Sequence, residues 1–497
     1  MNKLNLSQLA EQVVKCVARS VRNGNVYVPL NELVQMVRGQ HSDAELVMAI
    51  HEVLDEGVLV KTLTPAGKTV VYQPSLLQME KSAAQRLKLL AGTPVAPIKV
   101  ELSNNNLSEE QANAVYGCLA SKVAVLTGGP GTGKTTTLRA AIDAADRAGL
   151  DVILCAPTGQ AAKRMSAATG REASTVHRML GYNPETKEFN HSPDNYLPGD
   201  LIVIDESSML DLWLLHHLLR AVDGMTRILF VGDVNQLPSV GAGNVLNDII
   251  HSGIAHVAML TKTFRQGEGS RIIESATAIK TGVMPNLDNK GTDFFLFRVP
   301  SEETGQVIAD VVVDKIPQHF GFQPEEIQVL SPMYKGVAGV DDINSRLQER
   351  LNDDSTWYVK HKNGTFKVGD RIVQTKNNYD VNIMNGEVGN ITFINKKNKT
   401  VSIKFGDETV RYAYSDLWQI KLAYAITIHR SQGSEYAAVV IPVVENMSML
   451  QRNLLYTAIT RAKKLVVLVG SEAAIEAAIN DVSATQRWTA LADRIKE

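Results

Sequence analysis

A glycine-rich run between an apolar segment and a helical pattern is the part of the sequence best suited to chemistry. It follows the apolar residues 123–126, opens a helix near Thr136, and fits G-x-x-x-x-G-K-T with Gly128, Gly129, Pro130, Gly131, Thr132, Gly133, Lys134 and Thr135. Glycines let successive N–H groups turn toward phosphate oxygens, and a helix N-terminus adds about half a positive charge there. Lys134 is expected at the β- and γ-phosphates, and the Thr135 hydroxyl is expected on Mg²⁺. The run therefore predicts a nucleoside triphosphate site in preference to a plain glycine-rich turn.

Two carboxylates and a glutamine follow later apolar runs and extend this prediction. Asp205 and Glu206 end the apolar run that begins at Ile202. Because successive side chains on a strand point apart, the two carboxylates can do different work. Asp205 is expected to hold Mg²⁺ through its water shell, while Glu206 orients and deprotonates the attacking water. Gln236 follows the apolar run 228–231 and could hydrogen-bond both the γ-phosphate and that water.

The bulk composition is that of a globular protein and excludes a uniformly basic nucleic-acid binder. The chain has 497 residues, enough for two to four domains, and a formal net charge of −2. Any polyanion contact must therefore come from local patches. Cys16, Cys118 and Cys155 lack metal-ligand spacing and are expected to be reduced thiols. An apolar run of about 18 residues and an apolar signal core are both missing, so a cytoplasmic protein without membrane contact is expected.

The first part of the chain, residues 1–104, is predicted to be a winged-helix-like domain. Apolar residues recur at helical spacing up to Val21, a second helix covers 33–37, and Ser42 with Glu45 forms a capping box for a third. Two short strands around the turn 64–67 would form the wing. The third helix carries five carboxylates and neither lysine nor arginine, which disfavours a phosphate contact. A structural role or a protein partner is therefore the preferred interpretation of this acidic domain.

Apolar strands alternate with helical patterns from about residue 105 onward, as expected for parallel α/β sheets. One set of strands is predicted at 123–126, 152–155, 201–204 and 228–231. A second set is predicted at 328–331, 438–443 and 465–469. Between the parts of the second set, residues 343–420 alternate with period two and are predicted to form an inserted small β-barrel. Within this insert, residues 357–400 hold eight Lys/Arg against three acidic residues, so a solvated surface and a polyanion contact both remain open.

Further motifs in the same order resemble those of superfamily 1 helicases. They are Gln111, residues 156–160, 205–209, 232–240, 260–266, 330–336, 423–435 and 456–461. The order and the residues of these motifs are similar to those of the RecD family, a group that moves 5′→3′ along single strands. The resemblance covers about residues 105–470. It implies two RecA-like cores with parallel sheets, the first at 105–265 and the second at 266–342 and 421–497.

The resemblance also implies a role for each matching residue. Gln111 corresponds to a glutamine that reads the adenine edge, Glu435 to a ribose contact, and Arg265 and Arg461 to arginines brought onto the γ-phosphate of ATP. Always charged and planar, arginine suits that work. Residues 181–199 lie where relatives place a strand-separating hairpin, although a plain surface loop fits as well. The positions that match DNA contacts are Pro157, Thr158, Thr175, His177, Thr427 and His429.

These features together predict an ATP- and Mg²⁺-dependent 5′→3′ DNA helicase acting on single-stranded DNA and on single/double-strand junctions. Two alternatives stay open, namely an RNA-directed motor of the same superfamily and an ATP-switched DNA-binding subunit of a larger repair or recombination complex. In the second alternative, the acidic N-terminal domain would recruit the partner. The helix-hairpin-helix repeats that precede the core in longer RecD-like helicases are not seen in this sequence, which leaves open whether the chain works alone.

Overall fold

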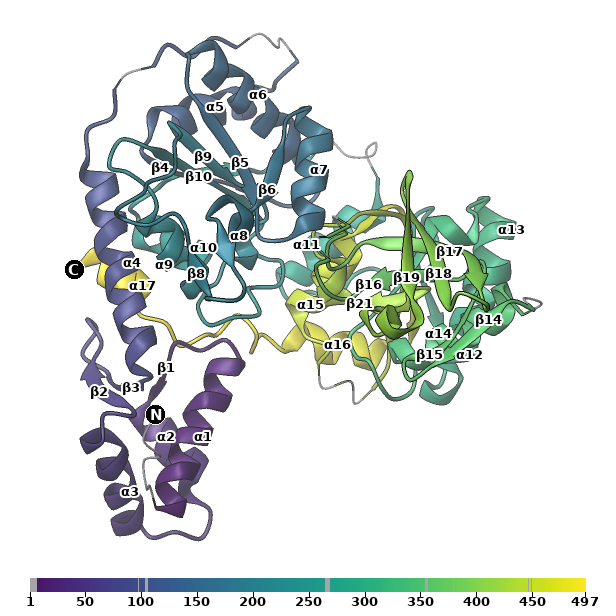
Figure 1. Cartoon of the computed structure of the whole chain (residues 1–497), viewed down its shortest axis with the longest axis horizontal. Helices are drawn as coiled ribbons and strands as arrows, with labels where there is room; N and C mark the ends of the chain where they lie inside the picture. Colours follow the sequence, from purple (N-terminus) through teal and green to yellow (C-terminus); the bar gives the residue numbers. More distant parts are fainter. Residues whose placement is uncertain are drawn as a thin grey trace. The chain divides into compact units, whose positions relative to one another are not determined.

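The computed structural model divides the chain into two compact units, whose elements are drawn in Figure 1. Unit 1 comprises Met1–Thr158, Met165–Arg265 and Ser483–Glu497, and unit 2 comprises Gly159–Arg164 and Gln266–Val482. Each unit has its own parallel sheet and its own hydrophobic core. The structure describes residues 7–96, 98–102, 106–263, 269–353, 356–378, 380–381, 383–445, 447 and 449–497.

The N-terminal part of unit 1 shows the predicted order of helix, strand, two helices and hairpin. The Ser42–Glu45 capping box is present, and Val13, Leu33 and Val53 pack in one buried cluster. The three strands form an antiparallel sheet in the order β1-β3-β2. The elements are α1 (Gln8–Arg22), β1 (Tyr27–Pro29), α2 (Leu30–Arg38), α3 (Asp43–Asp55), β2 (Val60–Leu63), β3 (Thr69–Tyr72) and then α4 (Pro74–Gly92).

The main sheet of unit 1 is parallel and has the order β11-β4-β10-β9-β5-β6. Alternate residues of its strands enter two different cores, with Ala124 and Leu126 in one and Val123 and Val125 in the other. Helices therefore cover both faces, which explains the continuous apolar runs in the sequence. The strands are β4 (Val123–Gly128), β5 (Val152–Ala156), β6 (Ala173–Thr175), β9 (Leu201–Ile204), β10 (Arg227–Gly232) and β11 (His256–Leu260).

The four strands predicted for this sheet are confirmed, whereas the edge strands β6 and β11 were not predicted. Both are partly exposed, so they lack the unbroken apolar runs of the central strands. Helices of this region are α5 (Glu109–Ala120), α6 (Lys134–Arg147), α7 (Gly159–Thr169), α8 (Val176–Met179), α9 (Leu212–Arg220) and α10 (Val245–Ser252).

Unit 2 holds the second predicted sheet, which is parallel with the order β12-β23-β22-β13-β21. Its strands are β12 (Phe294–Arg298), β13 (Ile327–Ser331), β21 (Ala425–Thr427), β22 (Tyr436–Val443) and β23 (Ala462–Gly470). The helices are α11 (Arg271–Lys280), α12 (Thr304–Asp310), α13 (Ile316–Phe320), α14 (Val340–Leu351), α15 (Arg452–Thr460) and α16 (Glu472–Asn480).

The inserted β structure is present, with bounds that differ from the prediction of 343–420. The start of that range lies in helix α14, and the strands extend from Tyr358 to Leu422. Five strands form an antiparallel sheet in the order β19-β18-β17-β16-β20, and β14 and β15 form a separate hairpin. These strands are β14 (Tyr358–His361), β15 (Gly364–Lys367), β16 (Arg371–Gln374), β17 (Val388–Asn395), β18 (Thr400–Phe405), β19 (Glu408–Ala413) and β20 (Ile420–Leu422).

The end of the chain departs most from the prediction. The second core was expected to run to residue 497, but Ser483–Glu497 belongs to unit 1, where α17 (Leu491–Lys496) packs against α4 and α10. Leu491 and Ile495 join the core of unit 1, and Arg494 Nε lies 2.9 Å from the fully buried carboxylate of Glu80. A buried carboxylate needs such a partner, and this contact links residues 414 positions apart. Within the described part of the chain, no helix has the length and apolar character that crossing a bilayer requires.

Candidate nucleotide and nucleic-acid site

The glycine-rich run forms a tight loop between β4 and α6. Gly131 and Gly133 have φ of +73° and +82°, a region that glycine enters without steric cost, and α6 begins at Lys134. Lys134 Nζ donates hydrogen bonds to the carbonyl oxygens of Gly128 (2.6 Å) and Gly129 (2.8 Å). The lysine thus lies folded over the loop, where phosphate oxygens could replace these carbonyls as acceptors. The residues present fit a phosphate group.

The predicted nucleotide groups of unit 1 follow neighbouring strands of one sheet. The phosphate loop follows β4, the Gln236 turn follows β10, and Asp205 and Glu206 follow β9. These three strands are neighbours in the sheet, in the order β4-β10-β9. Their carboxyl ends share one edge because the strands are parallel. On the other side of β4, Glu110 accepts hydrogen bonds from the N–H (2.9 Å) and hydroxyl (2.6 Å) of Thr261, just after β11. The start of α5, with Gln111, is thereby held at the same edge.

Glu206 has an uncommon backbone conformation. Its φ of 51° and ψ of 38° lie in the left-handed region, which costs a residue other than glycine about 1–3 kcal/mol and often marks functional sites. Its N–H donates to Asp205 Oδ1 at 2.8 Å. Because β9 ends at Ile204, Asp205 and Glu206 lie outside the strand, and the alternation of strand side chains does not apply to them. The left-handed turn is what separates a buried Glu206 from a half-buried Asp205.

Gln236 lies in a turn that is fixed by a buried carboxylate. Asp233 is 1% exposed and accepts hydrogen bonds at Oδ1 from Asn235 N (3.0 Å) and Asn235 Nδ2 (3.1 Å). The Gln236 N–H donates to the Asp233 carbonyl at 3.2 Å, and the Gln236 side chain is buried. On the neighbouring loop, Ser207 Oγ donates to the Val231 carbonyl at 2.8 Å. The segment after Glu206 is thus hydrogen-bonded to the end of β10, the strand that leads into the turn.

Gln111 has a second task that the sequence analysis missed. Its Oε1 accepts the N–H of Ser108 at 3.0 Å, and its own N–H donates to Ser108 Oγ at 3.2 Å, which makes a capping box for α5. The Ser-x-x-Gln spacing was a readable signal for this box. The Nε2 hydrogens of Gln111 make no hydrogen bond to another described residue, so the amide can still donate to a ligand.

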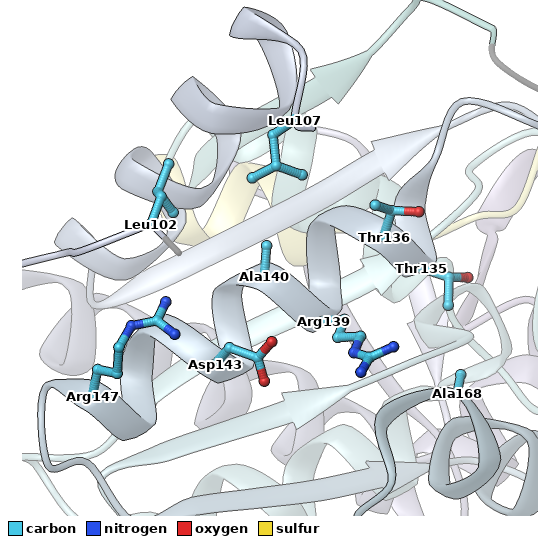
Figure 2. Close-up of a pocket in the computed structure, with 9 residues that line it drawn as sticks. All are labelled: Leu102, Leu107, Thr135, Thr136, Arg139, Ala140, Asp143, Arg147 and Ala168. Atoms are coloured by element: carbon cyan, nitrogen blue, oxygen red, sulfur yellow. The ribbon is translucent and has the colours of Figure 1, made fainter. Parts of the chain in front are cut away.

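A pocket of about 460 Å³ flanks the first turns of α6. Figure 2 shows Thr135, Thr136 and Arg139 on the helix that follows the phosphate loop, and Leu107 across from them on the segment that leads into α5. The volume lies within the range of small-molecule sites. Apolar and polar groups meet in this pocket, whose full lining is Leu102, Leu107, Thr135, Thr136, Arg139, Ala140, Asp143, Arg147 and Ala168.

The predicted DNA contacts of unit 1 follow the last two strands of the same edge. Pro157 and Thr158 come directly after β5, and Thr175 ends β6, where it pairs with Ala156. Thr175 caps α8, since its hydroxyl accepts the Arg178 N–H at 3.1 Å. Along this edge, the predicted nucleotide groups therefore lie at the ends of β4, β10 and β9, and the predicted strand contacts lie at the ends of β5 and β6.

His177 is the center of an aromatic cluster that the sequence analysis did not predict. Its ring lies 5.6 Å from Tyr182, 6.2 Å from Phe189 and 5.8 Å from Trp213, between ring centroids. Burial lowers the pKa of His177, and the carboxylate of Asp211 opposes this shift. The imidazole is therefore mainly neutral near pH 7 and could donate or accept a hydrogen bond without a full charge.

The segment 181–199 contains the predicted hairpin in short form. Its strands are β7 (Tyr182–Asn183) and β8 (Glu188–Phe189), which pair antiparallel. Phe189 packs 5.1 Å from Trp213 and 4.6 Å from His217 of α9, so the base of the hairpin is anchored. Its strand-separating role stays a prediction.

In unit 2, Thr427 ends β21 and caps a short 3₁₀ helix, Ile428–Ser431, with its hydroxyl accepting the Arg430 N–H at 3.3 Å. Burial lowers the pKa of His429. Thr427 and Arg430 line a pocket of about 440 Å³ together with Tyr334 and Lys421, whose Nζ lies 4.9 Å from the Tyr334 ring centroid.

Glu435 and Arg461 lie together at the amino ends of β22 and β23. The Tyr436 N–H donates to the Arg461 carbonyl at 2.9 Å, and Arg461 Nη1 donates to the Ser434 carbonyl at 3.3 Å. Glu435 is paired with Lys463 at 3.4 Å and Arg164 at 3.9 Å. That both residues reach a nucleotide stays a prediction. Arg265, the other predicted arginine, lies outside the described residues.

Comparison with protein-family models finds three matches along the chain. An AAA domain matches residues 106–292, and a UvrD-like helicase C-terminal domain matches residues 422–469. Between them, the SH3 domain of ATP-dependent RecD-like DNA helicases matches residues 343–405. The RecBCD enzyme subunit RecD of Mycolicibacterium smegmatis is 36% identical over 413 residues, covering 75% of this chain and 72% of that protein. The chain belongs to the RecD family.

Another RecD-family relative is the ATP-dependent RecD2 DNA helicase of Deinococcus radiodurans, 37% identical over 453 residues. The match covers 89% of this chain and 61% of the relative, so the chain spans less than two thirds of that protein's length. Among solved structures, the Pif1 helicase from Candida albicans aligns with a TM-score of 0.49 at 19% identity, covering 76% of this chain and 98% of that one. Membership of the RecD family confirms the resemblance predicted from the motifs.

Proposed function

We propose that this RecD-family chain is an ATP-dependent 5′→3′ DNA helicase that moves on single-stranded DNA and unwinds duplexes at single/double-strand junctions. The observation that carries the proposal is the carboxyl edge of the unit 1 sheet. The ends of β4, β10 and β9 present the groups for ATP, and the ends of β5 and β6 present the groups for the strand. The proposed hydrolysis and strand contacts thereby share one edge of one sheet.

In the proposed reaction, phosphate oxygens accept hydrogen bonds from the loop residues 128–136, and Lys134 leaves the carbonyls of Gly128 and Gly129 for the β- and γ-phosphates. Gln236 orients a water molecule, and Glu206 accepts its proton as the water oxygen attacks the γ-phosphorus. The bond from that phosphorus to the β-phosphate oxygen breaks, and ADP and phosphate leave. Mg²⁺, held by Thr135 and Asp205, would neutralise charge on the phosphates when bound. Arg265 and Arg461 would supply further positive charge at the γ-phosphate.

The nucleoside is proposed to occupy the pocket beside α6. Gln111 would donate from Nε2 to the adenine edge, and Leu107 would cover the base. Glu435 is proposed as the ribose contact once a nucleotide replaces its present ion pairs with Lys463 and Arg164.

Strand binding is proposed to come from phosphate contacts, which carry no sequence information and weaken with salt. In unit 1 these would be made by Pro157, Thr158, Thr175 and His177, and in unit 2 by Thr427 and His429. Unpairing costs about 1.4 kcal/mol per average DNA step, so the anchored hairpin in 181–199 need only hold a frayed pair apart. The domains that would do this work are the two RecA-like cores and the small barrel, with the winged-helix-like domain at the N-terminus.

The test is strand displacement and ATP turnover by Lys134→Ala beside the parent chain. We expect the variant to lose both activities, because the lysine that would hold the phosphates is removed, and to keep single-strand binding, because Lys134 is not among the proposed strand contacts. Lys68→Ala, in the exposed hairpin turn of the N-terminal domain, is the matched control and should keep both activities. Robust ATP turnover by Lys134→Ala would overturn the site. Unwinding from 3′ tails but not 5′ tails would overturn the direction, and stronger ATPase stimulation by RNA than by DNA would favour an RNA-directed motor.

A second candidate is a DNA-binding subunit that needs partners, because the Mycolicibacterium relative is named a subunit of the RecBCD enzyme. The acidic α3 of the N-terminal domain would be the proposed partner surface. DNA-stimulated hydrolysis by the purified chain without strand displacement would favour this candidate.

A further inference from the structure

The C-terminal segment lies against the loop that follows Gln236. Arg487 Nη1 donates hydrogen bonds to Ser239 Oγ (3.0 Å) and to the carbonyls of Gly241 (2.9 Å) and Gly243 (2.7 Å). Its Nη2 donates to the Ser239 carbonyl at 2.5 Å. One guanidinium group therefore holds residues 239–243 from inside the turn. This loop begins three residues after the proposed water-orienting glutamine.

The turn between α1 and β1 closes over the same guanidinium. A Cβ on Gly24 would fall 2.4 Å from Cζ of Arg487, so the close approach requires glycine there. The Gly24 carbonyl accepts the Gly243 N–H at 2.9 Å, and the Trp488 carbonyl accepts the Val26 N–H at 2.8 Å. Three segments that are far apart in the sequence thus meet at Arg487.

The chemistry of this junction favours an arginine. Three backbone carbonyls point toward one place, and buried carbonyls without a donor are costly. A planar guanidinium can serve them from two nitrogens, whereas a lysine ammonium donates from a single atom. Burial lowers the pKa of Arg487 to about 10, with the Asp211 carboxylate opposing the shift, so the group stays charged at neutral pH.

The tether from this loop to Gln236 is short and stiff. Leu237 is buried, and the ring of Pro238 fixes its φ, so the backbone between Gln236 and Ser239 has little conformational freedom. We therefore expect a shift of Ser239 to move Gln236 as well. The segment Ser483–Glu497, which carries Arg487, follows directly after Val482, the last residue of unit 2. The polypeptide therefore leads from unit 2 straight into the segment that binds this loop.

We propose that Arg487 is a positioning residue that sets the Ser239–Gly243 loop and, through it, the place of Gln236 during ATP hydrolysis. This inference rests on the proposed function, since it requires Gln236 to act at the γ-phosphate. Sub-ångström placement matters in such sites, and misplacement by about 1 Å can lower a rate by about a hundredfold.

The experiment measures kcat and KM for ATP at saturating single-stranded DNA, together with the melting temperature. Arg487→Met should lower kcat by about tenfold to a hundredfold with little change in KM, because the loss is in geometry and not in binding. Arg487→Lys should recover part of kcat. The double variant Gln236→Ala/Arg487→Met should be no slower than Gln236→Ala alone, since both changes remove the same function.

Thr489→Val is the matched control within the segment. Its hydroxyl lies 2.9 Å from Asp248 Oδ2 and 3.2 Å from Glu80 Oε1 and donates its single hydrogen between them. No hydrogen bond joins Thr489 to residues 239–243, all of which lie in the described part of the chain. We expect a lower melting temperature and an unchanged kcat. A parental kcat for Arg487→Met, or an equal loss of kcat in Thr489→Val, would overturn the inference. A parental kcat for Gln236→Ala would instead overturn the proposed role of Gln236.

Discussion

Two four-residue segments, one in each unit, have nearly the same sequence and the same threonine cap, although the first continues as the α-helix α8 and the second as a 3₁₀ helix. Thr175-Val-His-Arg178 begins at the last residue of β6, and Thr427-Ile-His-Arg430 begins at the last residue of β21. Both strands lie at an edge of their parallel sheets. In each segment the threonine hydroxyl accepts the N–H of the arginine three residues later, at 3.1 and 3.3 Å. A hydroxyl that accepts in this way can still donate its proton to a phosphate.

The neighbouring strands repeat the correspondence. Thr175 pairs with Ala156 of β5 and Thr427 pairs with Ser331 of β13, and a proline follows each partner. The two units therefore present equivalent threonines at equivalent places on their sheets.

The surroundings of the two segments differ. His177 packs among aromatic rings that belong to the hairpin and to α9, whereas His429 makes no ring contact with another described residue. Thr427 instead lines a pocket with Lys421 and Arg430. The short motif therefore sets its own threonine cap, whereas residues distant in sequence decide which other groups the side chains contact.

The largest expected effect comes from removing both hydroxyls. Thr175→Val with Thr427→Val should weaken single-strand binding by about a hundredfold or more, because each hydrogen bond to a charged group contributes about 1.5–3 kcal/mol and distant sites add. Fluorescence anisotropy with a labelled oligonucleotide at fixed salt measures this loss. Serine at both positions keeps the hydroxyls and should bind like the parent. If only one of the two valines weakens binding, the equivalence of the segments is lost.

An intermediate effect is expected from acid. Burial lowers the pKa of His177 and His429, so the unfolded chain takes up a proton near pH 6.5 when the folded chain does not. Stability therefore falls as the pH falls below about 6.5. His177→Gln should reduce this loss in unit 1 and His429→Gln should reduce it in unit 2. Pulse proteolysis at pH 7 and pH 5, with fragments assigned by mass spectrometry, measures each unit. An unchanged acid sensitivity in either variant would show that its histidine is not buried as described.

The smallest effect concerns salt. Arg178 is exposed and Arg430 is half-buried, and each is expected to contact one strand phosphate beside its threonine. Replacing either by glutamine should lower the slope of log affinity against log salt by about 0.7, the value for one single-strand phosphate contact. Binding titrations from low to moderate salt provide the slope. A change for Arg430→Gln alone would show that only the unit 2 segment meets a phosphate.

Much of the fold could be predicted because local patterns decide it. Residues 201–204 and 228–231 are apolar throughout, and strands buried on both faces need that pattern. The edge strand β11 escaped prediction because His256 and Met259 are exposed, which breaks the apolar run. The capping box of Gln111 had a local signal at Ser108, whereas the aromatic partner Trp213 of His177 had none.

The sequence by itself determined which groups stand at the carboxyl edge of the unit 1 sheet, since each follows a strand and parallel strands end together. It also determined the family, through motifs whose spacing is local. Only the tertiary structure decided that Arg487 returns to the loop after Gln236, that Gly24 closes over it, and that Glu206 adopts a left-handed turn. Contacts between residues hundreds of positions apart depend on how whole elements pack, and no periodicity along the chain records that packing.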